Sequence, residues 1–89
     1  MSKITVDIVT PKGIHYSGQI IGMTAPGLDG RFQILYNHAG LLAALAPGEI
    51  ELIHSSGSQS VRIGGGLLEV IKNQVNVMVE SVEEAGDAE

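Results

Sequence analysis

Three histidines are the side chains of this 89-residue chain best suited to bind a metal ion or to transfer a proton. His15, His38 and His54 fall in three separate segments, and their spacing matches none of the usual metal-ligand patterns. A small metal-dependent enzyme would need all three to converge in the fold. Turn or surface positions are the simpler interpretation. His38, between Asn37 and Ala39, is the best candidate for a contact residue, because loops carry recognition.

Paired carboxylates and a glycine run are the next patterns that could support chemistry. Glu49 and Glu51 share one face of an alternating segment, but Ile50 and Leu52 occupy the other face, so we expect the carboxylates to point to solvent. The glycines at 64–66 are not followed by the Lys-Ser or Lys-Thr of a phosphate-binding loop, and they predict a bulge or a close backbone approach. The sequence therefore assigns no catalytic, metal-binding or cofactor-binding residue.

Lys72 carries the alternative functional hypothesis, a carrier domain of the biotinyl or lipoyl kind. Such domains are small, acidic and all-β, and they present a modified lysine at a hairpin tip. Lys72 does fall in an expected hairpin turn. Its neighbours are Ile71 and Asn73 rather than the Met or Asp typical of that class, which counts against this hypothesis.

The elements that position these residues are predicted to be strands, because apolar and polar residues alternate with a period of two. The expected strands cover residues 4–8, 14–16, 19–25, 31–35, 49–54, 59–63, 67–71 and 75–79. We interpret Ser17-Gly18 as a break or a bulge, and the apolar segment 41–46 as a strand or a helical turn. Turn signals between short strands predict an all-β fold, a flattened β-sandwich or barrel of about ten strands over residues 1–80.

Charge is distributed unevenly along the chain. The net charge is −5, and five of the ten acidic residues lie in the last ten positions: Glu80, Glu83, Glu84, Asp87 and Glu89. We therefore expect residues 81–89 to form an acidic, mobile tail. The rest of the chain is neutral, which argues against nucleic-acid binding. Apolar runs reach no more than six residues, too few to insert into a bilayer.

The order of several short motifs points to a known family. They lie at residues 7–10, 17–18, 25–30, 34, 38–39, 41–42, 47–48, 65–66, 68–70 and 75–77. Each motif is weak by itself, but their order and spacing over residues 4–82 resemble the epsilon subunit of the F-type ATP synthase.

The resemblance implies a fold and a function. The N-terminal domain of that family is a ten-stranded β-sandwich that binds the gamma subunit and rests on the ring of c subunits, so that the three turn as one rotor. The subunit performs no chemistry, and it couples proton-driven rotation to ATP synthesis. The implied location is peripheral, on the cytoplasmic face of the bacterial inner membrane.

The resemblance also implies contact residues. The segment that faces the c ring matches Leu28, Asp29, Gly30, Arg31 and Phe32. The positions that face gamma match Thr10, His38, Ala39, Leu42 and Ala43. The chain departs from the family pattern at Arg31, where an acidic residue is usual. It also departs at Gln33 for glycine, at Tyr36-Asn37 for Pro-Gly and at Gly40 for proline.

Most members of the family add a C-terminal helical hairpin, which inhibits ATP hydrolysis and in some members binds ATP. The Ile/Leu-Asp-x-x-Arg-Ala pattern that opens this hairpin is not present here. We therefore expect a short form of the subunit, with no ATP binding and no inhibition by extended helices.

Overall fold

Ten strands make up the computed structural model, which describes residues 3–84. They are β1 (Ile4–Thr10), β2 (Gly13–Ile20), β3 (Gly22–Gly27), β4 (Gly30–Leu35), β5 (Leu41–Leu45), β6 (Gly48–His54), β7 (Gly57–Ile63), β8 (Gly66–Ile71), β9 (Gln74–Val79) and β10 (Val82–Glu84). The all-β prediction is confirmed, and the segment 41–46 resolves as a strand.

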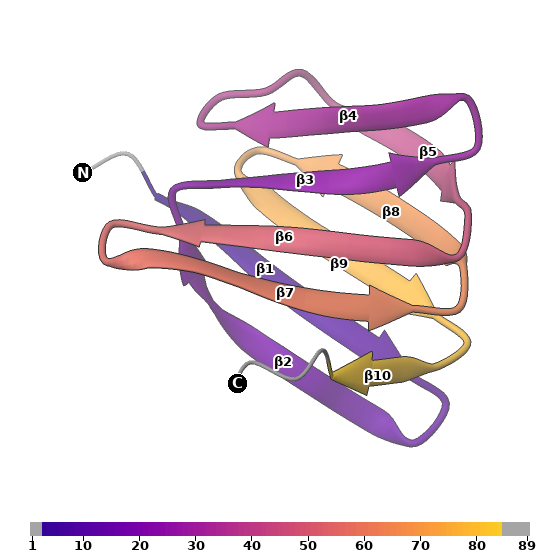
Figure 1. Cartoon of the computed structure of the whole chain (residues 1–89). Coiled ribbons are helices and arrows are strands. Elements are labelled where there is room, and N and C mark those ends of the chain that lie inside the picture. Colours follow the sequence, from indigo (N-terminus) through magenta and orange to yellow (C-terminus); the bar gives the residue numbers. More distant parts are fainter. Residues whose placement is uncertain (1–2, 85–89) are drawn as a thin grey trace.

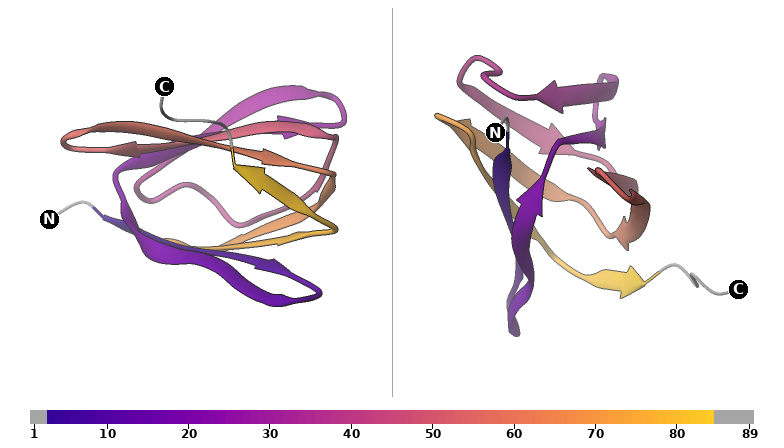
Figure 2. Two further views of the ribbon diagram at one scale, coloured as in Figure 1. Left: turned by 60° about the horizontal axis from the view of Figure 1, so that its bottom comes forward. Right: turned by 90° about the vertical axis from the view of Figure 1, so that its left-hand side faces the viewer.

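The strands form one sheet that folds over on itself into two layers (Figure 1). The order along the sheet is β10-β7-β6-β3-β5-β8-β9-β1-β2, with β4 paired to β3. We call β4, β3, β6, β7 and β10 the front layer, and β5, β8, β9, β1 and β2 the back layer. Figure 2 shows the two layers facing each other across the interior. Neighbouring strands are antiparallel except β1 and β9, which pair in parallel.

The interior is filled by the apolar residues of each alternating strand. Ile4, Val6 and Ile8 on β1 face Ile50 and Leu52 on β6 across the core, and all five are fully buried. A fully buried Ile or Leu side chain contributes about 1.5–3 kcal/mol to folding. Among the described residues no polar or charged side chain is buried, so the core is purely apolar.

The structure has neither a break nor a bulge at Ser17-Gly18, where one or the other was expected. Strand β2 is continuous from Gly13 to Ile20, and the register shift lies instead between Ile8 and Val9 of its partner β1. Gly18 serves another purpose, because a Cβ there would lie 2.9 Å from the hydroxyl oxygen of Tyr16. The glycine makes room for the Tyr16 ring within the strand rather than ending it.

Strands β3 and β10 also differ from the expected pattern. β3 begins at Gly22 and continues through Pro26 and Gly27, two residues beyond the expected end of the strand at residue 25. Val82–Glu84 pairs antiparallel with β7, whereas we had expected a mobile tail from Ser81 onward. Val82 packs partly against the core, and this contact explains why the segment is a strand. The rest of the expected tail, residues 85–89, lies outside the described residues.

Two tight connections agree with the sequence analysis. Lys72 and Asn73 form a two-residue turn between β8 and β9 with φ angles of 48° and 65°, as a type I′ hairpin requires. At Gly66 a Cβ would overlap the carbonyl oxygen of Met78, so this position needs glycine for the predicted close backbone approach.

Candidate interaction surface

The segment expected to face the c ring forms the tip of the β3–β4 hairpin. Gly27 pairs with Gly30, so Leu28 and Asp29 are the two turn residues. The Leu28 side chain is 67% exposed, whereas Phe32 packs partly against the core. Leu28 is therefore an apolar group exposed at a loop tip, where another protein can reach it.

Arg31 is held within the molecule by two hydrogen bonds. Its Nη1 donates to the carbonyl oxygen of Glu49 at 2.9 Å, and its Nη2 donates to the Thr24 hydroxyl at 2.7 Å. The planar guanidinium therefore connects β4 with both β3 and β6. Arg31 thus stabilises the β3–β4 hairpin through contacts within the chain.

Backbone hydrogen bonds tie the hairpin tip to β5. The Leu28 N–H donates to the carbonyl oxygen of Ala44 at 3.1 Å, and the Ala46 N–H donates to that of Pro26 at 2.8 Å. Between the tip and β5 lies an open groove of about 560 Å³, whose lining comprises residues 27–32 and 41–44. The structure thus brings all five expected c-ring residues together with Leu42 and Ala43, two of the expected gamma residues.

The loop before β5 carries His38 and Ala39. The His38 N–H donates to the carbonyl oxygen of Leu35 at 3.0 Å, which closes a turn with Asn37 at φ 66°. Asn37 and Asn73 exchange two hydrogen bonds: the Asn37 N–H donates to Oδ1 of Asn73 at 2.6 Å, and Nδ2 of Asn73 donates to Oδ1 of Asn37 at 3.0 Å. Tyr36 and Asn37, which differ from the family pattern, therefore lie in a turn that is hydrogen-bonded to the β8–β9 hairpin.

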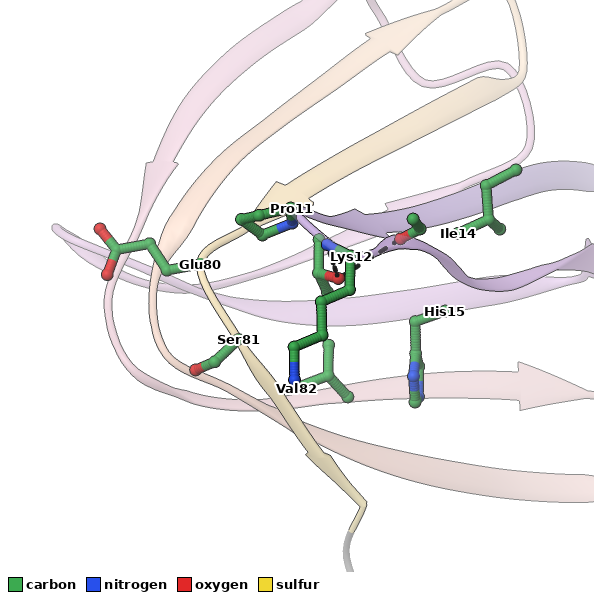
Figure 3. Close-up of a pocket in the computed structure, with 9 residues that line it drawn as sticks. Pro11, Lys12, Ile14, His15, Glu80, Ser81 and Val82 are labelled. Atoms are coloured by element: carbon green, nitrogen blue, oxygen red, sulfur yellow. Dashed lines mark hydrogen bonds between the residues drawn. The ribbon is translucent and has the colours of Figure 1, made fainter.

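Thr10, the fifth expected gamma residue, lies apart from the groove at the end of β1. Its hydroxyl oxygen accepts the Lys12 N–H at 3.1 Å and so closes the β1–β2 turn. This turn borders a second pocket of about 350 Å³, which also touches the segment between β9 and β10 (Figure 3). Its lining comprises residues 10–15 and 80–82.

The residues considered for chemistry remain dispersed. His15 lies on β2, His38 in the β4–β5 loop and His54 at the end of β6, and residues 3–84 contain no group of three or more acidic or histidine side chains that could hold a metal. Oε2 of Glu49 pairs with Arg62 on the neighbouring strand at 3.3 Å. The metal-dependent alternative therefore lacks the convergence that it requires.

Comparison with known proteins decides the family. The model of the family described as ATP synthase, Delta/Epsilon chain, beta-sandwich domain matches residues 3–85. The chain belongs to this family. It is 46% identical over 78 residues to the ATP synthase epsilon chain of Chlorobium limicola, which covers 86% of this chain and 89% of that one. The ATP synthase epsilon chain of Sulfurimonas denitrificans is 38% identical over 91 residues, covering all of this chain and 70% of its own length.

Two solved structures share the fold. A chain of the Euglena gracilis mitochondrial ATP synthase, in a structure of OSCP, F1 and c-ring, superposes with a TM-score of 0.90 at 17% identity. The match covers all of this chain and 57% of that chain. A chain of the Tetrahymena thermophila mitochondrial ATP synthase central stalk and c-ring gives a TM-score of 0.77 at 19% identity, over 91% of this chain and 66% of that one.

Membership of the family does not favour the carrier alternative, in which Lys72 would be modified. The β-sandwich predicted from the resemblance is confirmed. No helix among the described residues is long and apolar enough to cross a membrane.

Two exposed apolar residues of the back layer are absent from the contact residues expected from the sequence. Leu67 on β8 and Met78 on β9 are 45% and 42% exposed on the outer face of the back layer. The available signal was a local loss of alternation: Leu67 precedes the buried Leu68, and Met78 lies between the buried Val77 and Val79. Strands that are apolar on both faces are typical of sheets that are covered on both faces.

Proposed function

We propose that this chain is a non-catalytic rotor subunit of an F-type ATP synthase, where it joins the gamma subunit to the ring of c subunits. Family membership and the name shared by its relatives, ATP synthase epsilon chain, support this role. The subunit transmits rotation between its two partners and so couples proton flow to ATP synthesis. It sits peripherally, on the cytoplasmic face of the bacterial inner membrane.

One structural observation carries the proposal: the two contact elements are joined directly. The hairpin tip at Leu28 is hydrogen-bonded to β5 at Ala44, two residues from Leu42. Leu28 and Leu42 are 67% and 68% exposed and lie on the same groove. A rotor subunit must pass force from one partner to the other without deforming. A short path through backbone hydrogen bonds between two strands meets that requirement.

The assignment of partners to residues follows the family pattern. In the proposal the c ring contacts Leu28, Asp29, Gly30, Arg31 and Phe32 at the hairpin tip. The gamma subunit contacts Thr10, His38, Ala39, Leu42 and Ala43. No residue of the chain binds ATP in this proposal, because the role requires binding to other subunits rather than a nucleotide site.

Site-directed crosslinking in the assembled complex tests the two contact sets. The chain contains no cysteine, so Leu28→Cys and Leu42→Cys each carry a single thiol for a photoactivatable crosslinker. The thiol at 28 should capture a c subunit and the thiol at 42 should capture gamma, whereas Ser58→Cys, exposed at the far β6–β7 hairpin, should capture neither. Capture of gamma from position 28, or of neither subunit from both positions, would contradict the assignment.

A titration of the purified chain with the gamma subunit of the same organism tests the wider role. Calorimetry should show a stable complex, with the same affinity in the presence and absence of ATP. Absence of a complex would overturn the rotor proposal. Heat from ATP added to the chain by itself would overturn the statement that it does not bind nucleotide.

A further inference from the structure

The end of the sandwich opposite the Leu28 tip is a surface that the proposed function does not use. We call it the distal end, and it comprises Lys3 before β1 and the connections at residues 20–22, 35–41, 54–57 and 71–74. Figure 1 shows this end at the left, where the arrows of β4 and β6 end, whereas β3 runs to the Leu28 tip at the right. Strands of six residues separate the two ends by about 20 Å.

Exposed apolar side chains gather on the front-layer side of the distal end. Ile21, Leu35 and Tyr36 are 40%, 51% and 44% exposed. Leu35 pairs with Gly22 on β3, and Gly22 pairs with Ile53 on β6, so these positions share one face of the sheet. A Cβ at Gly22 would lie 3.0 Å from Cδ2 of Leu35 and 3.8 Å from Cδ1 of Ile53, so the two side chains close over the glycine. We call Ile21, Leu35, Tyr36 and Ile53 the distal patch.

The distal patch faces away from the gamma positions of the proposed function. Ile34 and Leu52 are fully buried in the core, so the alternation directs their neighbours Leu35 and Ile53 outward from the front layer. Leu42, one of the gamma positions, lies on the back layer, and Figure 2 shows the two layers on opposite sides of the interior. A gamma subunit that covers the back layer therefore leaves the distal patch exposed, although contiguous exposed apolar residues mark an interaction site.

Charge differs between the two ends of the sandwich. Among the described residues, the distal end contains Lys3 and Lys72 and no aspartate or glutamate. Neither ammonium group has an ion-pair partner within residues 3–84. The connections at the opposite end contain Asp29 and Glu80. The distal end is therefore positively charged, and its charges are available to a partner.

The Lys72 turn lies next to the distal patch. Asn37 and Asn73 exchange two hydrogen bonds, at 2.6 and 3.0 Å, across the β4–β5 and β8–β9 turns. Asn37 directly follows Tyr36 of the patch, and Asn73 directly follows Lys72, so these bonds hold the lysine turn at the border of the patch. An apolar surface with a cation at its border complements a segment that carries apolar side chains and carboxylates.

We infer that the distal patch is a docking surface for an acidic segment of the catalytic head, an inference that rests on the proposed function. In that function the Leu28 tip meets the c ring, so the distal end points away from the ring and toward the head, where ATP is made. The partner segment places apolar side chains on Leu35 and Ile53, and an Asp or Glu carboxylate beside Lys72. The apolar contact supplies most of the affinity, and the charges fix the orientation.

Crosslinking from Leu35→Cys in the assembled ATP synthase tests this contact. The chain contains no cysteine, and Leu35 is exposed, so the variant should fold like the wild type, which urea unfolding checks. A photoactivatable crosslinker on this thiol should capture a subunit of the catalytic head. The same crosslinker on Lys12→Cys, exposed in the β1–β2 turn at the opposite end, should capture no head subunit. Should Leu35→Cys unfold, Tyr36→Cys takes its place.

Lys72 and Lys12 form a matched pair for testing the charge of the partner. Each is exposed in a two-residue hairpin turn, one at each end of the sandwich. Added to Leu35→Cys, Lys72→Glu should lower the yield of crosslinking to the head about 5-fold or more, because it opposes the carboxylate of the partner with a like charge. Lys12→Glu should change the yield less than about 2-fold. Equal yields from the two double variants would overturn the acidic partner.

The outcomes separate this inference from the proposed function. If the thiols at positions 28 and 42 capture neither a c subunit nor gamma, the proposed function fails and the inference with it. If they capture both as assigned but the thiol at position 35 captures no head subunit, the proposed function stands and the distal patch is not the docking surface. Capture of gamma from position 35 would also overturn the inference, because gamma would then cover the front layer.

Discussion

The outer faces of the two layers differ in a way that their inner faces do not. Both layers direct alternate apolar residues into one core, but outside the front layer the central cross-strand row comprises Gln33, Thr24, Glu51 and Ser60. Outside the back layer one cross-strand row is apolar instead, and it comprises Ala44, Leu67, Met78 and Val9. The difference teaches that burial within the chain explains only the inner half of each strand's pattern, because the outer half differs between two layers that share one core.

The adjacent leucines of β8 provide the largest expected contrast between inside and outside. Leu68→Ala should reduce the free energy of unfolding by about 2–5 kcal/mol, because Leu68 is fully buried and its removal leaves a cavity. Leu67→Ala should cost less than about 0.5 kcal/mol in the isolated chain, because Leu67 faces outward. Urea unfolding measures both values. Equal losses would mean that the outer leucine serves the fold and not a partner.

The next largest effect is expected at Arg31 of the front layer, whose guanidinium is hydrogen-bonded within the chain. Arg31→Ala should cost about 1.5 kcal/mol, since the hydrogen bonds to Glu49 and Thr24 are lost. Arg31→Lys keeps the charge but cannot span both acceptors, so it should lose a large part of the same stability. Thermal unfolding of the two variants checks this. Full stability in Arg31→Lys would show that the charge matters and the planar fork does not.

On the back layer, the contact between Asn37 and Asn73 should hold the His38 loop. Asn73→Gly keeps the positive φ of the turn and removes the side chain, so the turn survives but its hydrogen bonds to Asn37 do not. We expect a loss of about 1 kcal/mol and faster hydrogen exchange at the Asn37 amide. Exchange by NMR measures the loop, with the Val77 amide in the centre of β9 as the internal reference. Unchanged exchange at Asn37 would show that the loop is ordered without this contact.

The smallest effect is expected at the exposed ion pair of the front layer. Arg62 and Glu49 lie 3.3 Å apart with side chains 53% and 43% exposed, so Arg62→Ala should cost less than about 0.5 kcal/mol. Affinity for gamma should also be unchanged, because the pair lies on the polar outer face. A clear loss of gamma binding would place the interface on the front layer and invert the comparison.

Much of the fold could be predicted from the sequence because one-sided burial produces a period of two. The hairpin at Lys72-Asn73 and the buried faces of β1, β6 and β7 follow directly from that pattern. The break or bulge expected at Ser17-Gly18 was wrong because a glycine can make room for a neighbouring ring, here Tyr16, as well as end a strand. β10 was missed because three residues paired to an edge strand carry too little alternation to recognise.

The candidate surface was predicted less completely than the fold. The resemblance supplied residues one at a time, and only the structure shows that Leu28 and Leu42 share a groove. Pairing between distant strands cannot be inferred from local pattern, so the alignment of Leu67, Met78 and Val9 in one row was not visible. The hydrogen bonds of Arg31 could not be predicted, because one acceptor, the carbonyl oxygen of Glu49, lies 18 residues further along the chain.

The parallel pairing of β1 with β9 has a consequence for how the chain is made. β1 leaves the ribosome well before its parallel partner at Gln74–Val79 has been synthesised. Until then β1 can pair only with β2, and Val6 and Ile8 have no complete core to enter. Such long-range pairing makes folding slow, on the order of milliseconds to seconds. The back layer, with its exposed apolar residues, can therefore be completed only after β9 has been synthesised, and until then the nascent chain needs protection from aggregation.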